Sequence, residues 1–327
     1  MILITGGTGL LGSQLIDDLT KKGNQILAPK RFESIVPDFL SNNNQVTWVD
    51  GNLFDLDFLS DCLSQVDTVI HAAAIVNFSA KNLNKLYRTN VALTKQIVDS
   101  SLTKGIKHFV HISSVAALGR DGKSLSLDET AKWAESDGNT HYARSKHLAE
   151  LEVWRSIEEG LPATIVNPSV ILGRCDITRS SGVLFGRILK NSKYYPEGNG
   201  NFVDVRDVSI AIQKIMEKKI IGERFILNGI SLDNKELYTK VAQRLNKKLP
   251  SKEITRKQLK YLKPIENFIS FLSFRTPQIS RDIIKLVGTS YKYLNKKSIE
   301  ELELNYTDID DTIDYAVSYL QQKLNQN

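Results

Sequence analysis

The sequence predicts an α/β fold in which helices cover a doubly wound, parallel sheet. Two observations support this prediction. Short β-rich runs alternate with longer segments of helical apolar spacing through the first half of the chain, which is typical of successive βαβ units. A glycine-rich turn over residues 5–12 also joins the first β-rich run directly to the first helical segment.

Six strands and four helices are expected in this first half. The β-rich runs are residues 1–5, 25–28, 46–50, 68–72, 108–113 and 163–167. The segments with apolar residues at helical spacing are residues 10–22, 54–63, 83–104 and 142–159. Because helical segments separate the strands, neighbouring strands are expected to run parallel.

The pattern becomes looser after residue 167. A helix is expected over residues 205–218, and the apolar run 224–227 is expected to return to the sheet as an extra strand. From residue 234 onward the sequence predicts helices joined by loops that contain Pro250, Pro264 and Pro277. This region is expected to be mostly helical.

The composition favours a soluble globular protein and excludes several other classes. A net charge of +6 on 327 residues is only mildly basic, and an anionic small molecule accounts for it without nucleic acid. Cys62 and Cys175 have no CxxC spacing and the five histidines no metal-ligand spacing, so neither a disulfide framework nor a metal is expected. The start has no pattern of a secretory leader, and no stretch is apolar enough to span a membrane, so we expect a cytoplasmic protein.

The glycine-rich turn is suited to binding a dinucleotide. It contains both Gly7-x-Gly9-x-x-Gly12 and Gly6-x-x-Gly9-x-x-Gly12. Without side chains there, backbone N–H groups and a helix N-terminus can approach a pyrophosphate. We therefore predict a dinucleotide-binding Rossmann domain over residues 1–167 and a substrate-binding region over residues 168–327, of which 202–228 packs back onto the Rossmann sheet. The turn residues expected to bind the cofactor are Gly6, Gly9, Leu10, Leu11 and Gly12.

A basic pair at the end of the second strand predicts which cofactor is bound. An Asp or Glu about 20 residues beyond the glycine turn usually binds the ribose 2′-hydroxyl of NAD. Lys30 and Arg31 stand there instead, and they favour the 2′-phosphate of NADP. Two alternatives stay open: Glu33 is the acid if the strand is longer, with NAD as the cofactor, or both cations are solvated loop residues.

Ser114, Tyr142 and Lys146 form a candidate catalytic set. Ser114 follows a β-rich run, and 28 residues later Tyr142 and Lys146 stand at i and i+4, which puts phenol and ammonium on one helix face. The phenol of tyrosine ordinarily has a pKa of about 10, and a nearby ammonium lowers that pKa because it favours the phenolate. Tyr142 then becomes a usable acid or base. Tyr-x-x-x-Lys pairs are common on helices by chance. This pair gains weight because it follows a glycine turn that is suited to binding a dinucleotide.

These motifs in this order resemble the extended short-chain dehydrogenase/reductase superfamily, the NAD(P)-dependent epimerase/dehydratase-like proteins. The likeness covers nearly the whole chain. Besides the glycine turn, Ser114 and the tyrosine-lysine pair, it rests on residues 71–74, 90–91, 167–173 and 202–208.

The resemblance implies a role for each matching residue. Tyr142 would be the acid/base, and Lys146 would bind the nicotinamide ribose and lower the pKa of the phenol. Ser114 would hydrogen-bond the substrate oxygen, Pro168 would lie under the nicotinamide, and Asn90 would tie the central strands together. The adenine and its ribose would lie against Asn52, Leu53, Ala72, Ala73 and Ala74.

Two further segments indicate the branch of the family. Residues 167–174, NPSVILGR, and 196–212, PEGNGNFVDVRDVSIAI, are similar to the dihydroflavonol reductase and 3β-hydroxysteroid dehydrogenase-like proteins. Sugar-nucleotide dehydratases carry an Asp-Glu pair directly after the catalytic Ser or Thr, because elimination of water needs its own acid and base. Here Val115 and Ala116 follow Ser114, which disfavours dehydration.

The sequence thus predicts an NADPH-dependent reductase that transfers a hydride to a ketone or aldehyde carbonyl of a small, apolar substrate. The alternative is a nucleotide-sugar epimerase with bound NAD(P). A non-catalytic dinucleotide-binding regulator is less favoured, because Tyr142 and Lys146 are both present. The family's habit implies a homodimer through residues 83–104 and 142–159. The aromatic residues that would line an apolar pocket, or else belong to the core, are Tyr194, Tyr195, Phe268, Phe271 and Phe274.

Overall fold

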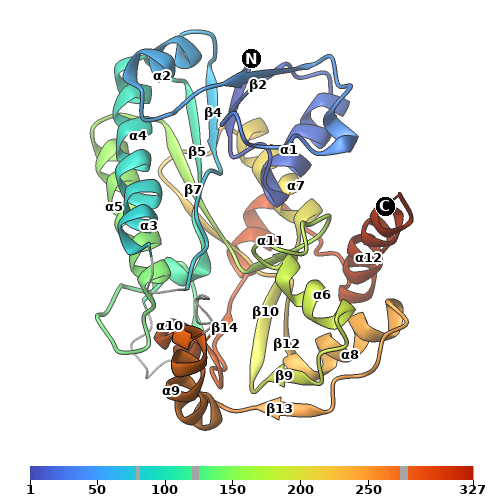
Figure 1. The fold of residues 1–327 in the computed structure, drawn as a ribbon. Helices are drawn as coiled ribbons and strands as arrows, with labels where there is room; N and C mark the ends of the chain where they lie inside the picture. The colour runs from blue at the N-terminus through green and yellow to red at the C-terminus, as the bar shows by residue number, and fades with distance from the viewer. Residues whose placement is uncertain (79–81, 120–124, 273–278, 327) are drawn as a thin grey trace.

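The computed structural model describes residues 1–78, 82–119, 125–272 and 279–326 (Figure 1). Within these residues the main sheet has seven parallel strands in the spatial order β11-β7-β5-β4-β1-β2-β3. The doubly wound α/β fold is confirmed, and residues 224–227 do return to the sheet, beside β7. The strands are β1 (Ile2–Thr5), β2 (Ile26–Lys30), β3 (Val46–Asp50), β4 (Thr68–His71), β5 (His108–Ile112), β7 (Ala163–Pro168) and β11 (Arg224–Leu227).

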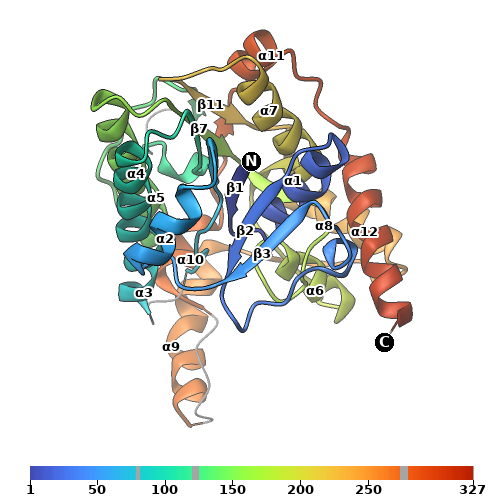
Figure 2. The same ribbon diagram turned by 90° about the horizontal axis from the view of Figure 1, so that it is seen from above.

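Helices cover both faces of this sheet (Figure 2). Ile2 and Ile4 of β1 are buried with side chains of one helix pair, whereas Leu3 is buried with side chains of the helices on the opposite face. This alternation follows from the two-residue period of a strand, and it explains why the central strands are apolar throughout. The first face carries α1 (Leu10–Lys21) and α7 (Val205–Glu217), and the second carries α2 (Leu56–Leu63), α4 (Leu93–Thr103) and α5 (His141–Glu158).

The single helix predicted over residues 83–104 is divided in the structure. A short helix, α3 (Leu83–Tyr87), leads into a π-helical turn, Arg88–Ala92, and then into α4. π-helical turns are rare and occur often at functional sites. This one carries the buried side chain of Asn90.

Among the described residues, the second half of the chain forms three small sheets, one of them with residues 126–127, that the sequence analysis did not predict. β8 (Val170–Leu172), β10 (Asn199–Asp204) and β12 (Ile230–Asp233) form one, β9 (Tyr194–Pro196) pairs with β13 (Lys252–Ile254), and β6 (Ser126–Leu127) pairs with β14 (Lys292–Tyr293). Short 3-10 turns occur at Asp38–Leu40 and Val115–Ala117. The helices of this half, besides α7, are α6 (Gly182–Leu189), α8 (Asn234–Arg244), α9 (Arg256–Leu272), α10 (Arg281–Leu286), α11 (Lys296–Leu302) and α12 (Ile309–Gln326).

Of residues 202–228, which we expect to pack back onto the main sheet, α7 covers one face of that sheet and β11 joins it, whereas the first three residues form part of a smaller sheet. Phe202, Val203 and Asp204 belong to β10, which pairs with β8 and β12 in the smaller sheet. Asp204 then caps α7, because its side chain accepts a hydrogen bond from the backbone N–H of Arg206. The chain changes sheets at this cap. The boundary of the two domains stays a prediction.

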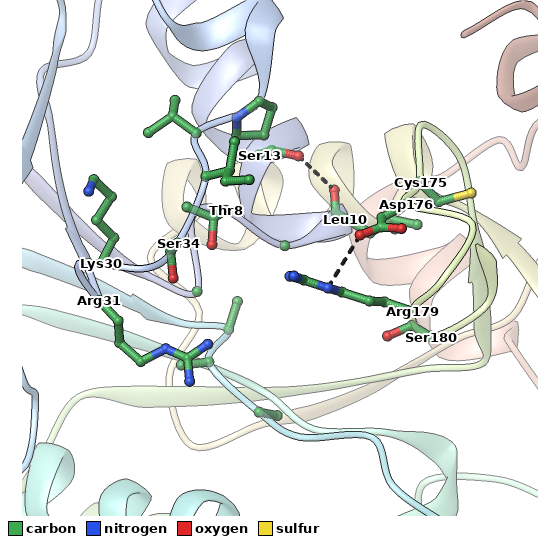
Figure 3. A pocket seen from close by; sticks show the side chains of 18 of the residues that line it. Thr8, Leu10, Ser13, Lys30, Arg31, Ser34, Cys175, Asp176, Arg179 and Ser180 are labelled. Atoms are coloured by element: carbon green, nitrogen blue, oxygen red, sulfur yellow. Dashed lines mark hydrogen bonds and ion pairs between the residues drawn. The ribbon is translucent and has the colours of Figure 1, made fainter. Parts of the chain in front are cut away.

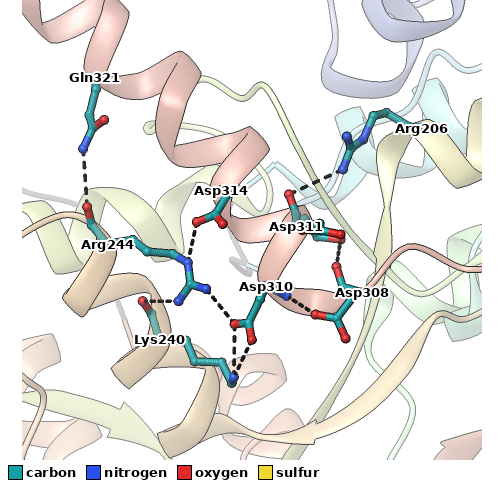
Figure 4. Close-up of polar contacts among 9 residues, drawn as sticks. Arg206, Lys240, Arg244, Asp308, Asp310, Asp311, Asp314 and Gln321 are labelled. Atoms are coloured by element: carbon teal, nitrogen blue, oxygen red, sulfur yellow. Dashed lines mark hydrogen bonds and ion pairs between the residues drawn. The ribbon is translucent and has the colours of Figure 1, made fainter.

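Ion pairs fasten the C-terminal helix α12 to α8 (Figure 4). Arg244 of α8 contacts Asp310 at 2.8 Å and Asp314 at 2.5 Å, and Lys240 contacts Asp310 at 3.1 Å. These side chains are partly exposed, so each pair contributes about 1 kcal/mol or less. Their main effect is to fix how α12 lies along α8.

Two general properties follow from the described residues. None of the helices in the described ranges combines the length and apolar character needed to cross a membrane. Cys62 and Cys175 are both buried free thiols. Their side chains also form no cluster with other His, Cys, Asp or Glu residues in the described part of the chain that could hold a metal ion.

Candidate active site

The glycine turn between β1 and α1 is shaped by backbone contacts that leave no room for side chains. Gly6 has φ +72°, and a Cβ atom there would lie 2.8 Å from the backbone nitrogen of Ala73. A Cβ atom on Gly12 would lie 2.2 Å from the carbonyl oxygen of Gly6. Gly9 caps α1 without any side-chain hydrogen bond, so the first N–H groups of the helix remain available to a ligand.

A cavity of about 860 Å³ opens in front of this turn. Its size is in the range of small-molecule and cofactor sites. The uncapped helix end and the glycine surface in its wall fit a dinucleotide pyrophosphate. Of the predicted cofactor residues, those that line the cavity are Gly6, Gly9, Leu10, Lys30, Arg31, Asn52, Leu53, Ala72, Ala73 and Ala74.

The other five predicted cofactor residues lie outside this lining. Leu11 is buried in the core between the sheet and α7, and Gly12 closes tightly against Gly6. Both residues therefore shape the turn, and contact of their backbone N–H groups with the cofactor stays a prediction. Tyr142, Lys146 and Pro168 belong instead to the carboxyl ends of β5 and β7 and to the start of α5, which form the second part of the site.

The two basic residues after β2 have different partners. Lys30 Nζ lies 2.5 Å from Asp50 Oδ1 at the end of β3, and only 15% of its side chain is exposed. The Arg31 side chain is 63% exposed and pairs with Glu33 at 3.3 Å. Figure 3 shows the guanidinium of Arg31 reaching into the pocket region apart from Lys30. Because an exposed ion pair is weak, Arg31 is better placed than Lys30 to exchange its partner for a phosphate group.

A loop that the sequence analysis missed forms the opposite wall of the cavity. Asp176, Arg179 and Ser180 lie in the connection between β8 and α6 and line the pocket (Figure 3). Arg179 pairs with Asp176 at 3.3 Å. No spacing in the sequence indicates this placement, because it depends on how the smaller sheet packs against the Rossmann sheet.

Hydrogen bonds fix the backbone after β4, which forms the floor of the cavity. The Thr5 hydroxyl accepts the N–H of Ala73 at 3.2 Å and contacts His71 Nδ1 at 2.8 Å. Asn90 accepts the N–H of Ile75 at 2.8 Å and donates to its carbonyl at 3.0 Å. The side chain of Asn90 thus ties down the segment that follows β4 rather than the central strands themselves.

Asn90 also connects this floor to the helix that carries the tyrosine. Its Nδ2 donates to Ser145 Oγ at 3.0 Å, and Ser145 Oγ donates to the carbonyl of Tyr142 at 2.8 Å. The first turn of α5 is capped by Thr140, which accepts the N–H of Ala143. The position of Tyr142 is thus fixed from two directions.

The structure brings together Ser114, Tyr142 and Lys146. A hydrogen bond joins the side chains of Ser114 and Tyr142 and lowers the pKa of the phenol, although burial, the larger cause, raises that pKa overall. Lys146 is 2% exposed and donates to the carbonyl of Ile112 at 2.8 Å. Burial lowers the pKa of Lys146 to about 8, and Glu150 opposes this shift.

The expectation that Lys146 holds down the pKa of Tyr142 is not what the structure indicates. In the chain itself burial outweighs the favourable contacts, and Ser114 supplies the contact that lowers the pKa of the phenol. Tyr142 therefore carries its proton at neutral pH. A phenol in this state can donate a proton to an oxygen beside it.

Other expected residues lie elsewhere. Tyr195 is buried in the core of the second half, and Tyr194 is about half exposed. Phe274 and the side chains of Phe268 and Phe271 lie outside the described residues. The aromatic side chain that does contact the candidate catalytic group is one the sequence analysis did not single out. It is that of Phe78, whose ring stands edge-on to Tyr142 at 5.6 Å between centroids.

Comparison with known proteins agrees with this geometry. The chain is 28% identical over 324 residues to a putative dihydroflavonol 4-reductase of Synechocystis sp., which covers 97% of the chain and 94% of the relative. It is 26% identical over 330 residues to sterol demethylase protein B of Methylococcus capsulatus, at 98% coverage of both. The solved UDP-glucuronic acid 4-epimerase of Bacillus cereus, in complex with NAD, superimposes with a TM-score of 0.78 at 17% identity, covering 98% of this chain and 96% of that one.

A family model matches most of the Rossmann part and the strand that returns to it. The model is that of the NAD dependent epimerase/dehydratase family, and the match covers residues 2–227. This range includes the glycine turn, Ser114, Tyr142 and Lys146. The chain therefore belongs to the NAD dependent epimerase/dehydratase family and is an NAD(P)-dependent enzyme of the extended short-chain dehydrogenase/reductase type.

Proposed function

We propose that this protein is an NADPH-dependent reductase that acts on the ketone or aldehyde carbonyl of a small, apolar substrate. The observation that carries the proposal is the pairing of Ser114 with a protonated, partly buried Tyr142, one helical turn from Lys146. Reduction of a carbonyl needs a proton donor at the oxygen, and a phenol that keeps its proton at neutral pH can serve as one.

The chain's own residues divide the work as follows. Ser114 donates a hydrogen bond to the carbonyl oxygen and holds it beside Tyr142. Tyr142 gives its proton to that oxygen as negative charge develops on it. Lys146, fixed by the carbonyl of Ile112, directs its ammonium toward the cofactor ribose and the phenol. Phe78 packs against the ring of Tyr142 and helps to exclude water from the phenol.

The cofactor would be held along the cavity described above. The glycine turn and the N-terminus of α1 would bind the pyrophosphate, and Arg31 the 2′-phosphate. Asn52 and Leu53 would lie beside the adenine, Ala72 to Ala74 beside the ribose, and Pro168 under the nicotinamide. When bound, NADPH supplies the hydride that reduces the carbonyl carbon.

Two rival reactions are less well supported. Val115 and Ala116 form a short 3-10 turn after Ser114, so the acid and base that dehydration needs are missing from those two positions. Epimerisation on tightly held NAD favours an acid at the end of β2, where Arg31 faces the cavity instead. Glu33 is paired with Arg31 rather than turned toward a ribose site.

Steady-state assays test this function. Purified protein is incubated with NADPH and a panel of apolar ketones and aldehydes, and in parallel with UDP-sugars. We expect cofactor oxidation with the carbonyl panel, and a loss of about a thousandfold in kcat for Tyr142→Phe without a large change in NADPH binding. Tyr306→Phe, which loses hydrogen bonds to Ser298 and to the backbone of Asn228, is the matched control.

Two results would contradict the proposal. Interconversion of UDP-sugars without net consumption of cofactor would establish the epimerase instead. Retained reduction by Tyr142→Phe would exclude the phenol as proton donor.

Association of two copies through residues 83–104 and 142–159 stays a prediction, which light scattering tests.

A further inference from the structure

A buried carboxylate, Glu150, lies beneath the candidate catalytic residues. Its side chain is fully buried in the middle of α5. A buried carboxylate is costly unless charged or polar partners surround it. Glu150 has two such partners, Asn167 at 2.5 Å and the guanidinium of Arg224.

Asn167 connects Glu150 to the main chain that carries the serine. The same Nδ2 group of Asn167 donates to Glu150 Oε1 and, at 2.9 Å, to the carbonyl oxygen of Ser114. Asn167 is fully buried in β7, next to Pro168, and Arg224 comes from the neighbouring strand β11. The carboxylate thus fixes the amide of Asn167, and the amide fixes the backbone of Ser114.

Glu150 also stands one helical turn beyond Lys146 on α5, so the two side chains are neighbours on the helix. Its negative charge raises the pKa of Lys146, against the effect of burial. The other titratable or charged groups around this pair are Arg224 on β11, and His71 and His111, which are buried and whose pKa values are lowered by burial and by Lys146.

We propose that Glu150 is a positioning residue of the active site, which fixes Ser114 through Asn167 and places a carboxylate beneath Lys146. This inference rests on the proposed function for its kinetic consequences. The arrangement of the carboxylate, the amide and the ammonium does not depend on the proposed function, because it is the same whatever carbonyl is reduced.

Glu150→Gln tests the charge while it keeps the shape of the side chain. We expect kcat for carbonyl reduction to fall about tenfold, and the alkaline limb of the pH profile, where Lys146 loses its proton, to move about one unit toward lower pH. The matched control is Glu152→Gln on the same helix, whose carboxylate pairs with Arg155 and is partly exposed. It should leave the pH profile in place.

A second measurement separates this proposal from the proposed function. With ¹³C-labelled lysine, the ε-carbon of Lys146 is titrated by NMR and assigned by its absence in Lys146→Met. A lower pKa of Lys146 in Glu150→Gln supports the proposal even if no carbonyl compound is reduced, in which case the function alone fails. An unchanged pKa of Lys146 together with an unchanged pH profile overturns it.

Glu150→Gln leaves the guanidinium of Arg224 without its partner, and this could prevent folding. The double variant Glu150→Gln/Arg224→Gln removes both charges, and Arg224→Gln alone keeps the carboxylate. If the charge of Glu150 acts on Lys146, the pKa of Lys146 falls in the double variant relative to Arg224→Gln. Equal values in these two variants contradict the proposal.

Discussion

Lys30 and Arg31 are neighbours in the sequence, yet the ion pair of Lys30 is mostly buried and that of Arg31 is exposed. The sequence predicts a basic pair at the ribose, and both residues line the cavity. It cannot show that Asp50, twenty residues away, neutralises Lys30, because that contact arises from the pairing of β2 with β3. The proposed selectivity for NADPH would therefore depend on Arg31.

Arg31→Ala should raise the dissociation constant of NADPH at least about tenfold, since a charge-assisted contact with a phosphate is lost. Binding of NADH, which has a 2′-hydroxyl, should change little in the same variant and is the internal control. Fluorescence titration with each nucleotide measures both constants. A parallel loss for the two nucleotides would mean that Arg31 supports the loop and does not read the phosphate.

The glycine turn is the element on which cofactor binding depends most directly. Gly12→Ala would place a methyl group 2.2 Å from the carbonyl oxygen of Gly6, and neither backbone can yield cheaply. We expect a loss of about 2 kcal/mol or more in stability and a matching loss of NADPH binding. Thermal denaturation and fluorescence titration measure these effects.

Gly138→Ala is the matched control for this substitution. A Cβ atom at that position would meet only Ser136 Oγ at an ordinary distance of 3.5 Å. Its stability and nucleotide binding should stay close to those of the parent chain. If Gly12→Ala behaved like Gly138→Ala, the turn would be looser than its contacts indicate.

Strands and helices with a strong apolar period were predictable from the sequence, and contacts between distant segments were not. The strands β1 to β5 and β7 follow the β-rich runs closely, because a strand covered by helices on both sides must present apolar side chains to each side. The π-helical turn at Asn90 was missed, because it depends on hydrogen bonds to Ile75, fifteen residues earlier. Glu150 continues the i, i+4 series of Tyr142 and Lys146, and that spacing could have identified it.

The molecule as a whole should lose stability in acid, because its central strands carry buried, neutral histidines. Burial lowers the pKa of His71 from 6.5 to about 3, so between these values the unfolded chain binds a proton that the folded chain excludes. Stability is therefore full above pH 6.5 and falls by about 1.4 kcal/mol per pH unit for this one group as the pH drops toward 3.

Urea denaturation between pH 7.5 and pH 4.5 measures this loss. His71→Asn should show a shallower dependence of the free energy of unfolding on pH, by about one proton. His141→Asn removes an exposed histidine and should keep the slope of the parent chain. An identical slope in His71→Asn would mean that His71 does not remain neutral in the folded chain.

The helix α12 gives the nucleotide a wall from the far end of the sequence. Tyr319 and Lys323 line the same cavity as the glycine turn, and Lys323 pairs with Asp38, 285 positions earlier. With the dinucleotide in this cavity, as we propose, undocking of this helix and release of the dinucleotide would be thermodynamically linked, and each change would promote the other to the same extent. A bound dinucleotide then acts as a reversible cross-link between remote parts of the polypeptide, which ties retention of the cofactor to the integrity of the entire fold.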